Sequence, residues 1–291
     1  MGSEAGRSAL EREDVIRFMR DGFVRIEGAF SREAAAACCE RIAAHGGIDL
    51  TDRSSWKQPV ARIIGAGDPL FAEVMNTPKL HAAYDTLVGP GRWVPRNNIG
   101  YVVVRFPHAE NPGDAGWHIE ASYSVEGEPG VNVFSRDRAL LVLLLLSDVG
   151  SDDAPTRVRV GSHLLVPSQL RDAGAVGMRS FDVATDTPEM EACAVASVTG
   201  AAGDVYLCHP FLVHSASWPH RGVAPRFMAQ PALVSKEPFE YERASGRYSP
   251  LEIAGRIGLG MESLDDALAS DWLGAGMLPV PAVAVQHGPQ G

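Results

Sequence analysis

The spacing of apolar residues predicts helices in the first third of the chain. In residues 9–20 apolar side chains recur at helical intervals, and Gly22 follows as a stop signal. A second helix is predicted over residues 31–46, where a serine caps the start, and a third over residues 77–89, where a proline follows the capping threonine. A short strand is expected between the first two helices. Residues 1–90 are therefore predicted to be mainly helical.

From about residue 93 the pattern changes to short β-rich runs. These runs continue to about residue 235 and are separated by turns rich in Gly, Pro, Asn and Asp. So many short strands favour a sandwich or barrel over a parallel α/β sheet. The apolar run 139–146, ALLVLLLL, is too short to cross a bilayer and fits a strand that is buried on both faces.

The whole chain, residues 1–291, is predicted to form a single domain with four parts. These parts are a mainly helical annex (1–90), a β-rich core (93–235), C-terminal helices (236–275) and a loose tail (276–291). The helical pattern returns after the core in SPLEIAGRIGL and SLDDALASDWL.

Composition narrows the classes of function. The chain is 45% hydrophobic and 21% charged, which is typical of a globular protein. Its net charge of −10 gives no electrostatic support for nucleic-acid binding. The four cysteines include no CxxC pair and the N-terminus has no apolar signal region, so we expect reduced thiols, a cytoplasmic location and no membrane attachment. Oligomeric state is left open.

The segment AGWHIEASY contains a candidate metal-binding pair. In a strand His118 and Glu120 would point to one side while Ile119 packs on the other. Histidine and carboxylate side chains are both suitable ligands for a divalent metal. A second pair of this kind, His108 and Glu110, lies in a proline-flanked segment, so the spacing alone does not select a site.

A third ligand is available in residues 203–226, which contain His209, His214 and His220 and end at Arg226. Two histidines and one carboxylate leave three octahedral positions open, as in the facial triad of non-haem Fe(II) oxygenases. Where 2-oxoglutarate is the cosubstrate, its distal carboxylate needs a buried cation, for which arginine is well suited.

The order of these features resembles the phytanoyl-CoA dioxygenase family. The shared pattern is W-H-x-(D/E), then APTRVRVGSH, then G-D-x9-H, then an arginine twelve positions on, and DGFVRIEGAFS resembles the family's entry strand and helix. The resemblance extends from about residue 14 to 235. It implies a mainly β fold with flanking helices, in which the core is a double-stranded β-helix of the jelly-roll, cupin-like type.

The resemblance also implies roles for individual residues. The family's metal ligands fall on His118, Glu120 and His214, and its 2-oxoglutarate arginine falls on Arg226. The family usually has aspartate where this chain has Glu120, and often tryptophan where it has Leu143. The longer glutamate remains a competent ligand, and keeping a carboxylate argues against halogenation.

The implied activity is oxidation of a small-molecule metabolite, with hydroxylation as the default, by an enzyme that uses Fe(II), 2-oxoglutarate and O2. Natural-product biosynthesis is one setting in which the family acts. Asn98, Tyr101 and Arg105 lie on or near the strand before the metal pair and are candidate substrate contacts. Two alternatives stay open: an inactive ligand-binding relative, and a metal-dependent cupin enzyme that does not use 2-oxoglutarate.

Overall fold

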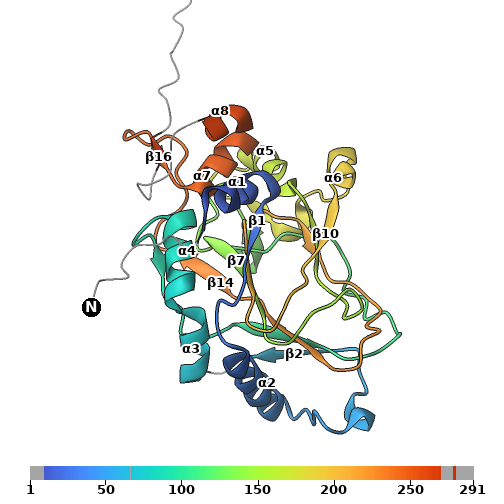
Figure 1. Cartoon of the computed structure of the whole chain (residues 1–291). Coiled ribbons are helices and arrows are strands. Elements are labelled where there is room, and N and C mark those ends of the chain that lie inside the picture. The colour runs from blue at the N-terminus through green and yellow to red at the C-terminus, as the bar shows by residue number, and fades with distance from the viewer. Residues whose placement is uncertain (1–9, 66, 270–277, 280–291) are drawn as a thin grey trace, which may run out of the picture.

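The computed structural model describes residues 10–65, 67–269 and 278–279. Two antiparallel sheets form its centre, and most helices lie on one side of them (Figure 1). In Figure 1 helices α1 and α7 lie at the top, α3 and α4 at the left and α2 at the bottom, whereas β10 and α6 lie at the right. This is the mainly β jelly-roll architecture with flanking helices that the sequence predicts, so the predicted fold class is confirmed.

The larger sheet has eight strands, six of which form one continuous order. That order is β1 (Phe23–Ile26), β11 (Val205–Cys208), β7 (Leu140–Leu145), β13 (Arg226–Ala229), β4 (Tyr101–Arg105) and β2 (Val60–Ile64). The remaining two are β14 (Ala232–Ser235), which pairs with β7, and β3 (Trp93–Val94), which pairs with β14. Strand β1, near the start of the chain, therefore shares one sheet with β13 and β14, which lie some 200 residues later.

The smaller sheet contains β10 (Val195–Ser197), β8 (Arg157–Arg159) and β12 (His214–Ser215). A single bridge between His118 and His214 extends it by one more segment. A further small sheet joins β5 (Tyr123–Val125), β6 (Glu128–Val131) and β9 (Met178–Arg179).

Strand β7 is buried on both faces, as its unbroken apolar sequence predicts. Leu140, Val142 and Leu144 belong to the larger core cluster, which includes the apolar side chains of the helices. The alternating residues Leu141, Leu143 and Leu145 belong to a separate cluster formed with residues of β8 and β11. The alternation of side chains along a strand thus places β7 between two cores.

The five predicted helices are present near the expected residues, whereas three shorter helices, over residues 69–75, 166–171 and 188–192, were not predicted. They are α1 (Arg12–Asp21), α2 (Arg32–Gly46), α3 (Pro69–Met75), α4 (Pro78–Val88), α5 (Val166–Arg171), α6 (Pro188–Ala192), α7 (Pro250–Gly258) and α8 (Leu264–Ala269), with short 3-10 turns at Arg53–Ser55, Ser162–Leu164 and Ser180–Asp182. The Ser31 side chain accepts a hydrogen bond from the Ala34 N–H at the start of α2, and Thr77 caps α4 in the same way. Gly22 ends α1 in the left-handed conformation, with φ at 90°.

Several details differ from the predicted elements. β1 and β2 both belong to the larger sheet, and β2 has no clear alternation that would have revealed it. Residues 118–120 do not form a regular strand, because only the bridge at His118 is present and β5 begins at Tyr123. Of the predicted tail, 276–291, only β16 (Leu278–Pro279) is described; it pairs with β15 (Arg247–Tyr248). The rest lies outside the described residues.

The structure also bears on the cysteines and on membranes. Cys38, Cys39, Cys193 and Cys208 are all described and all are free thiols. Among the helices of the described ranges, none is long and apolar enough to span a bilayer.

Candidate metal centre

Two segments that are nearly a hundred residues apart meet at the candidate site. The His118 N–H donates to the His214 carbonyl at 3.0 Å, and the His214 N–H donates to the His118 carbonyl at 2.9 Å. Ile119 packs into the core on the other side of the segment. Although no regular strand forms there, the backbone is extended enough to keep His118 and Glu120 on one side.

The neighbouring Trp117 holds this segment against the smaller sheet. The Arg157 and Arg159 guanidinium groups lie 5.1 and 4.7 Å from the centre of its indole ring. Both arginines come from β8, the strand that also pairs with β12 and therefore with His214. The segment that carries His118 and the strand that carries His214 therefore both contact β8.

His118, Glu120 and His214 form a compact cluster. One potential ligand atom from each lies within 4.8 Å of the others, and His214 Nε2 is 3.4 Å from Glu120 Oε1. Across the described ranges this is the one group of three or more His, Cys, Asp or Glu side chains close enough to share an ion. The three residues predicted as ligands are therefore brought together.

Hydrogen bonds fix which nitrogen each histidine presents. Nδ1 of His118 lies 2.9 Å from the Gly116 carbonyl oxygen, and Nδ1 of His214 lies 2.9 Å from that of Leu212. Since a carbonyl can only accept, each Nδ1 must donate its N–H, and each Nε2 keeps its lone pair for a ligand bond. Histidines that bind metals are commonly oriented in this way.

Glu120 provides the negative charge of the cluster. Burial alone would raise the pKa of its carboxyl group, but the nearby His214 and Arg138 outweigh this and lower the pKa to about 2. Burial, followed by the neighbouring His214, lowers the pKa of His118. Two imidazoles that present Nε2 and one carboxylate fit a divalent metal of the iron type.

Arg226 is buried, and among the described residues no acidic side chain is in hydrogen-bonding contact with it. It begins β13 and is 2% exposed. One of its terminal nitrogens donates to the Ala154 carbonyl at 3.1 Å, while its Nε has no partner. Burial, and then the neighbouring Arg105, lowers its pKa to about 9. A guanidinium group in such surroundings needs an anion.

Two further donors beside Arg226 lack acceptors. Arg105 is its register partner on β4; it forms an ion pair with Asp114 at 2.7 Å but leaves its own Nε unpartnered. His220 Nδ1 accepts from the Gly222 N–H at 3.1 Å, so its buried Nε2 carries the hydrogen, and this N–H has no partner. A carboxylate would satisfy these donors, which is the requirement for binding the distal end of 2-oxoglutarate.

Asn98 and Tyr101, which were predicted as substrate contacts, are not among the residues of the metal cluster. The Asn98 amide oxygen accepts a hydrogen bond from Arg96 at 2.7 Å. Tyr101, at the far end of β4 from Arg105, is 57% exposed. Their role as substrate contacts, like that of Arg105, stays a prediction.

The alternative histidines do not join the cluster. His108 forms a backbone bridge with His220, and its Nδ1 accepts from the Glu110 N–H, while the Glu110 side chain is exposed. His209 is fully buried against His163, with ring centres 5.1 Å apart.

Arg138 is a residue of this site that sequence reasoning missed. It precedes β7, donates from Nε to the Ala121 carbonyl at 2.8 Å, and places a terminal nitrogen 3.5 Å from Glu120. The only signal was a charged residue next to the apolar run 139–146, which does not reveal where the side chain points.

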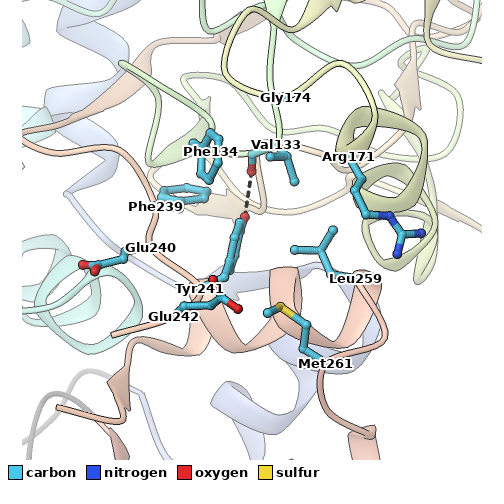
Figure 2. Close-up of a pocket in the computed structure, with 10 residues that line it drawn as sticks. All are labelled: Val133, Phe134, Arg171, Gly174, Phe239, Glu240, Tyr241, Glu242, Leu259 and Met261. Carbon is cyan, nitrogen blue, oxygen red and sulfur yellow. Dashed lines mark hydrogen bonds between the residues drawn. The ribbon is translucent and has the colours of Figure 1, made fainter. Parts of the chain in front are cut away.

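A separate pocket of about 440 Å³ lies outside the metal cluster (Figure 2). Figure 2 shows Tyr241 pointing across it, where its hydroxyl donates to the Val133 carbonyl at 2.7 Å. Its lining is Val133, Phe134, Arg171, Gly174, Phe239, Glu240, Tyr241, Glu242, Leu259 and Met261. It contains none of the three candidate ligands.

Known proteins resemble this chain in family and in fold. The family model described as phytanoyl-CoA dioxygenase (PhyH) matches residues 18–228. No curated protein matches the chain in sequence.

Among solved structures, HygX from Streptomyces hygroscopicus, with nickel, 2-oxoglutarate and hygromycin B bound, is 18% identical, with a TM-score of 0.52 over 80% of this chain and 90% of its own. The 2-oxoglutarate-dependent epimerase SnoN from nogalamycin biosynthesis is 19% identical, with a TM-score of 0.51 over 82% of this chain and 83% of its own. The carbocyclase SnoK from the same biosynthesis is 15% identical, with a TM-score of 0.54 over 81% and 88%. At these identities the likeness concerns the fold.

Proposed function

Because the chain belongs to the phytanoyl-CoA dioxygenase family, we propose that it is an Fe(II)- and 2-oxoglutarate-dependent dioxygenase that oxidises a small molecule. The observation that carries this proposal is the convergence of His118, Glu120 and His214 on one point. The unpartnered donors around Arg226 support the second half of it, the use of 2-oxoglutarate.

The protein residues have distinct roles in this proposal. His118 and His214 would bind iron through Nε2, and Glu120 through its carboxylate. Arg226 would bind the distal carboxylate of 2-oxoglutarate, with Arg105 and His220 as additional donors. When bound, iron would provide the site at which O2 is activated, and 2-oxoglutarate would supply two electrons to O2 as it is decarboxylated to succinate and CO2. The chain itself holds the reactants in place and limits access of water.

Hydroxylation of the substrate is the outcome we propose. It requires that one oxygen atom enters the substrate and the other enters succinate. The structural relatives include an epimerase and a carbocyclase. Identifying the reaction product would distinguish hydroxylation from epimerisation and ring closure. A natural-product intermediate is a substrate class that fits relatives which bind hygromycin B or act in nogalamycin biosynthesis.

The proposal also covers the domain organisation, the substrate contacts and the location of the protein. We propose that the chain, residues 1–291, acts as one oxygenase domain on a small molecule, with Asn98 and Tyr101 among the residues near the substrate. Four free thiols are compatible with the reducing cytoplasm, the predicted location.

Release of succinate from 2-oxoglutarate tests the proposal. Arg226→Gln is expected to raise the KM for 2-oxoglutarate at least about 30-fold, because a buried charge pair loses one partner. The exposed Arg41, whose guanidinium lies near the helix-capping Asp68, provides a control, and Arg41→Gln should leave the KM unchanged.

Two outcomes would contradict the proposal. An unchanged KM for 2-oxoglutarate in Arg226→Gln, or turnover that does not need 2-oxoglutarate, would favour a cupin-type enzyme that does not use this cosubstrate. Retention of iron in His118→Ala would show that the ligands lie elsewhere, with His108 and Glu110 as the first candidates.

A further inference from the structure

We propose that Arg138 is a positioning residue that restricts Glu120 to binding the metal through one of its two carboxylate oxygens. This restriction would keep one coordination position of the metal open for O2. The inference rests on the proposed function and deepens it, because it concerns the same metal cluster. Its evidence is that the two oxygens of Glu120 have different partners.

Only one oxygen of Glu120 lies on the histidine side of the cluster. Oε1 is 3.4 Å from His214 Nε2, the nitrogen that is free to bind a metal. Oε2 is 3.5 Å from a terminal nitrogen of Arg138. One oxygen is therefore placed for the metal, whereas the other already has a cationic partner.

Arg138 contacts the Glu120 segment at two points. Its Nε donates to the carbonyl of the next residue, Ala121, at 2.8 Å, while a terminal nitrogen contacts the Glu120 side chain. Its other terminal nitrogen has no partner among the described residues, so no second acid there competes for the guanidinium. The side chains of Arg138 and Glu120 are 13% and 26% exposed, so water screens their attraction only partly.

A tight turn before β7 fixes the backbone of Arg138. Its N–H donates to the Ser135 carbonyl, and the Ser135 hydroxyl donates to the Arg138 carbonyl at 2.7 Å. Ser135 and Asp137 have positive φ values, 39° and 69°, which residues other than glycine rarely adopt. The Ala139 N–H donates to the Leu233 carbonyl at 2.7 Å, which joins the turn to β14. The guanidinium therefore extends from an anchored backbone, as a positioning residue requires.

A glutamate ligand needs such a restraint more than an aspartate does. Its side chain has one more torsion, whose freedom is lost when the carboxylate is held. A carboxylate can also bind a metal through one oxygen or through both. A charge-assisted hydrogen bond to Oε2 favours the one-oxygen mode, because Oε2 would have to leave Arg138 to join the metal.

The binding mode of Glu120 decides how many positions of the metal remain open. Two histidines and one carboxylate oxygen occupy three of the six octahedral positions, whereas two carboxylate oxygens would raise this to four. 2-Oxoglutarate can supply two donor oxygens, one from its keto group and one from the adjacent carboxylate. If Glu120 used both oxygens, 2-oxoglutarate would fill the last positions and leave none for O2. With Arg138 on Oε2, one position stays open.

Binding of nitric oxide tests this inference, because nitric oxide takes the position of O2 without turnover. Under anaerobic conditions the full chain is loaded with Fe(II) and 2-oxoglutarate and titrated with nitric oxide. The iron–nitrosyl complex is followed by visible absorption and by electron paramagnetic resonance. The Kd for Fe(II) is measured separately for each protein. The variants are Arg138→Gln, Arg138→Lys and the exposed control Arg41→Gln.

In Arg138→Gln we expect Fe(II) to bind at least as tightly as in the unaltered protein. The apparent Kd for nitric oxide should nevertheless rise about tenfold or more, since the charged hydrogen bond that favours the one-oxygen mode is lost. Arg138→Lys keeps a positive charge and should recover most of the nitric oxide affinity. Arg41→Gln should match the unaltered protein.

A crystal structure of the unaltered chain with nickel and 2-oxoglutarate gives a second measurement, which decides the matter if Arg138→Gln does not fold. We expect a bond from nickel to Glu120 Oε1 alone and a hydrogen bond from Arg138 to Oε2. Bonds from nickel to both oxygens, or an Oε2 without contact to Arg138, would overturn the inference.

The titration can also overturn the inference. An unchanged Kd for nitric oxide in Arg138→Gln would do so, and weaker Fe(II) binding alongside it would assign the arginine a merely structural role. If the unaltered protein binds Fe(II) and 2-oxoglutarate but the variant gives either result, the inference alone fails. If the unaltered protein does not bind Fe(II), the proposed function fails and the inference fails with it.

Discussion

His163 and His209 show what a buried histidine does in this fold when it is not near the metal cluster. Both are fully buried, His163 Nε2 lies 3.0 Å from the Met19 carbonyl oxygen, and His209 Nε2 lies 3.2 Å from that of Leu251. Each ring therefore donates from Nε2, the nitrogen that His118 and His214 keep free. In this fold a structural histidine donates a hydrogen bond from Nε2 to a backbone carbonyl, whereas a candidate metal ligand donates from Nδ1 and leaves Nε2 free.

The buried His163 makes the stability of the protein sensitive to acid. Burial lowers its pKa from 6.5 to about 4, so the unfolded chain takes up the proton first as pH falls. Stability is retained above about pH 6.5 and lost between about pH 6.5 and 4, by an amount on the order of 3 kcal/mol. Urea unfolding at pH 7 and pH 4.5 measures this loss.

His163→Gln provides the comparison, because its amide can still donate to the Met19 carbonyl. We expect this variant to lose less stability than the unaltered protein between the two pH values. The exposed His45→Gln serves as the control and should show the full loss. An equal loss in all three proteins would exclude His163 as the cause.

At the scale of single elements, helix ends were the most predictable feature. Capping residues and terminal glycines mark α1, α2 and α4 in the sequence, because these signals act through neighbouring backbone groups. β2 was not predictable, since its place depends on pairing with β4 and not on a local pattern. The same is true of the His118 segment, whose bridge to His214 is a tertiary contact.

Two helix-ending glycines allow a matched test of packing. Gly22 and Gly47 both end helices with positive φ, but a Cβ at Gly22 would lie 2.5 Å from His163 Nδ1, whereas a Cβ at Gly47 would meet nothing within 4 Å. Gly47→Ala should cost about 1–2 kcal/mol from backbone strain alone. Gly22→Ala should cost a further 1–3 kcal/mol, roughly, from overpacking.

Urea midpoints of the two variants give this difference directly. Equal losses in the two variants would show that the loop at His163 moves away freely. That result would contradict the close packing of α1 against the 3-10 turn.

At the scale of the whole molecule, the site joins parts of the chain that are distant in sequence. His118, His214 and Arg138 come together only because β7, β8 and β12 lie in two facing sheets. The spacing of histidines and carboxylates alone did not select a site, and the cluster was predicted from the resemblance of their order to the phytanoyl-CoA dioxygenase family. Arg138 could not be predicted, since its position depends on the turn that its N–H closes onto the Ser135 carbonyl at one end of β7.

Metal binding should therefore stabilise the complete fold. A ligand present at 100 times its Kd stabilises the native state by about 2.7 kcal/mol, provided that the unfolded chain does not bind it. We expect nickel to raise the melting temperature of the unaltered protein and not that of Glu120→Ala. An equal rise in both proteins would indicate that nickel binds outside the cluster.

The most direct test of the central claim is anaerobic titration of the metal-free protein with Fe(II) and then 2-oxoglutarate, followed by visible absorption. We expect a weak charge-transfer band that requires both additions and is lost in Glu120→Ala and in Arg226→Gln. If iron binds but no band appears with 2-oxoglutarate, the cosubstrate assignment is wrong. If iron does not bind at all, the chain is a binding protein on an oxygenase fold.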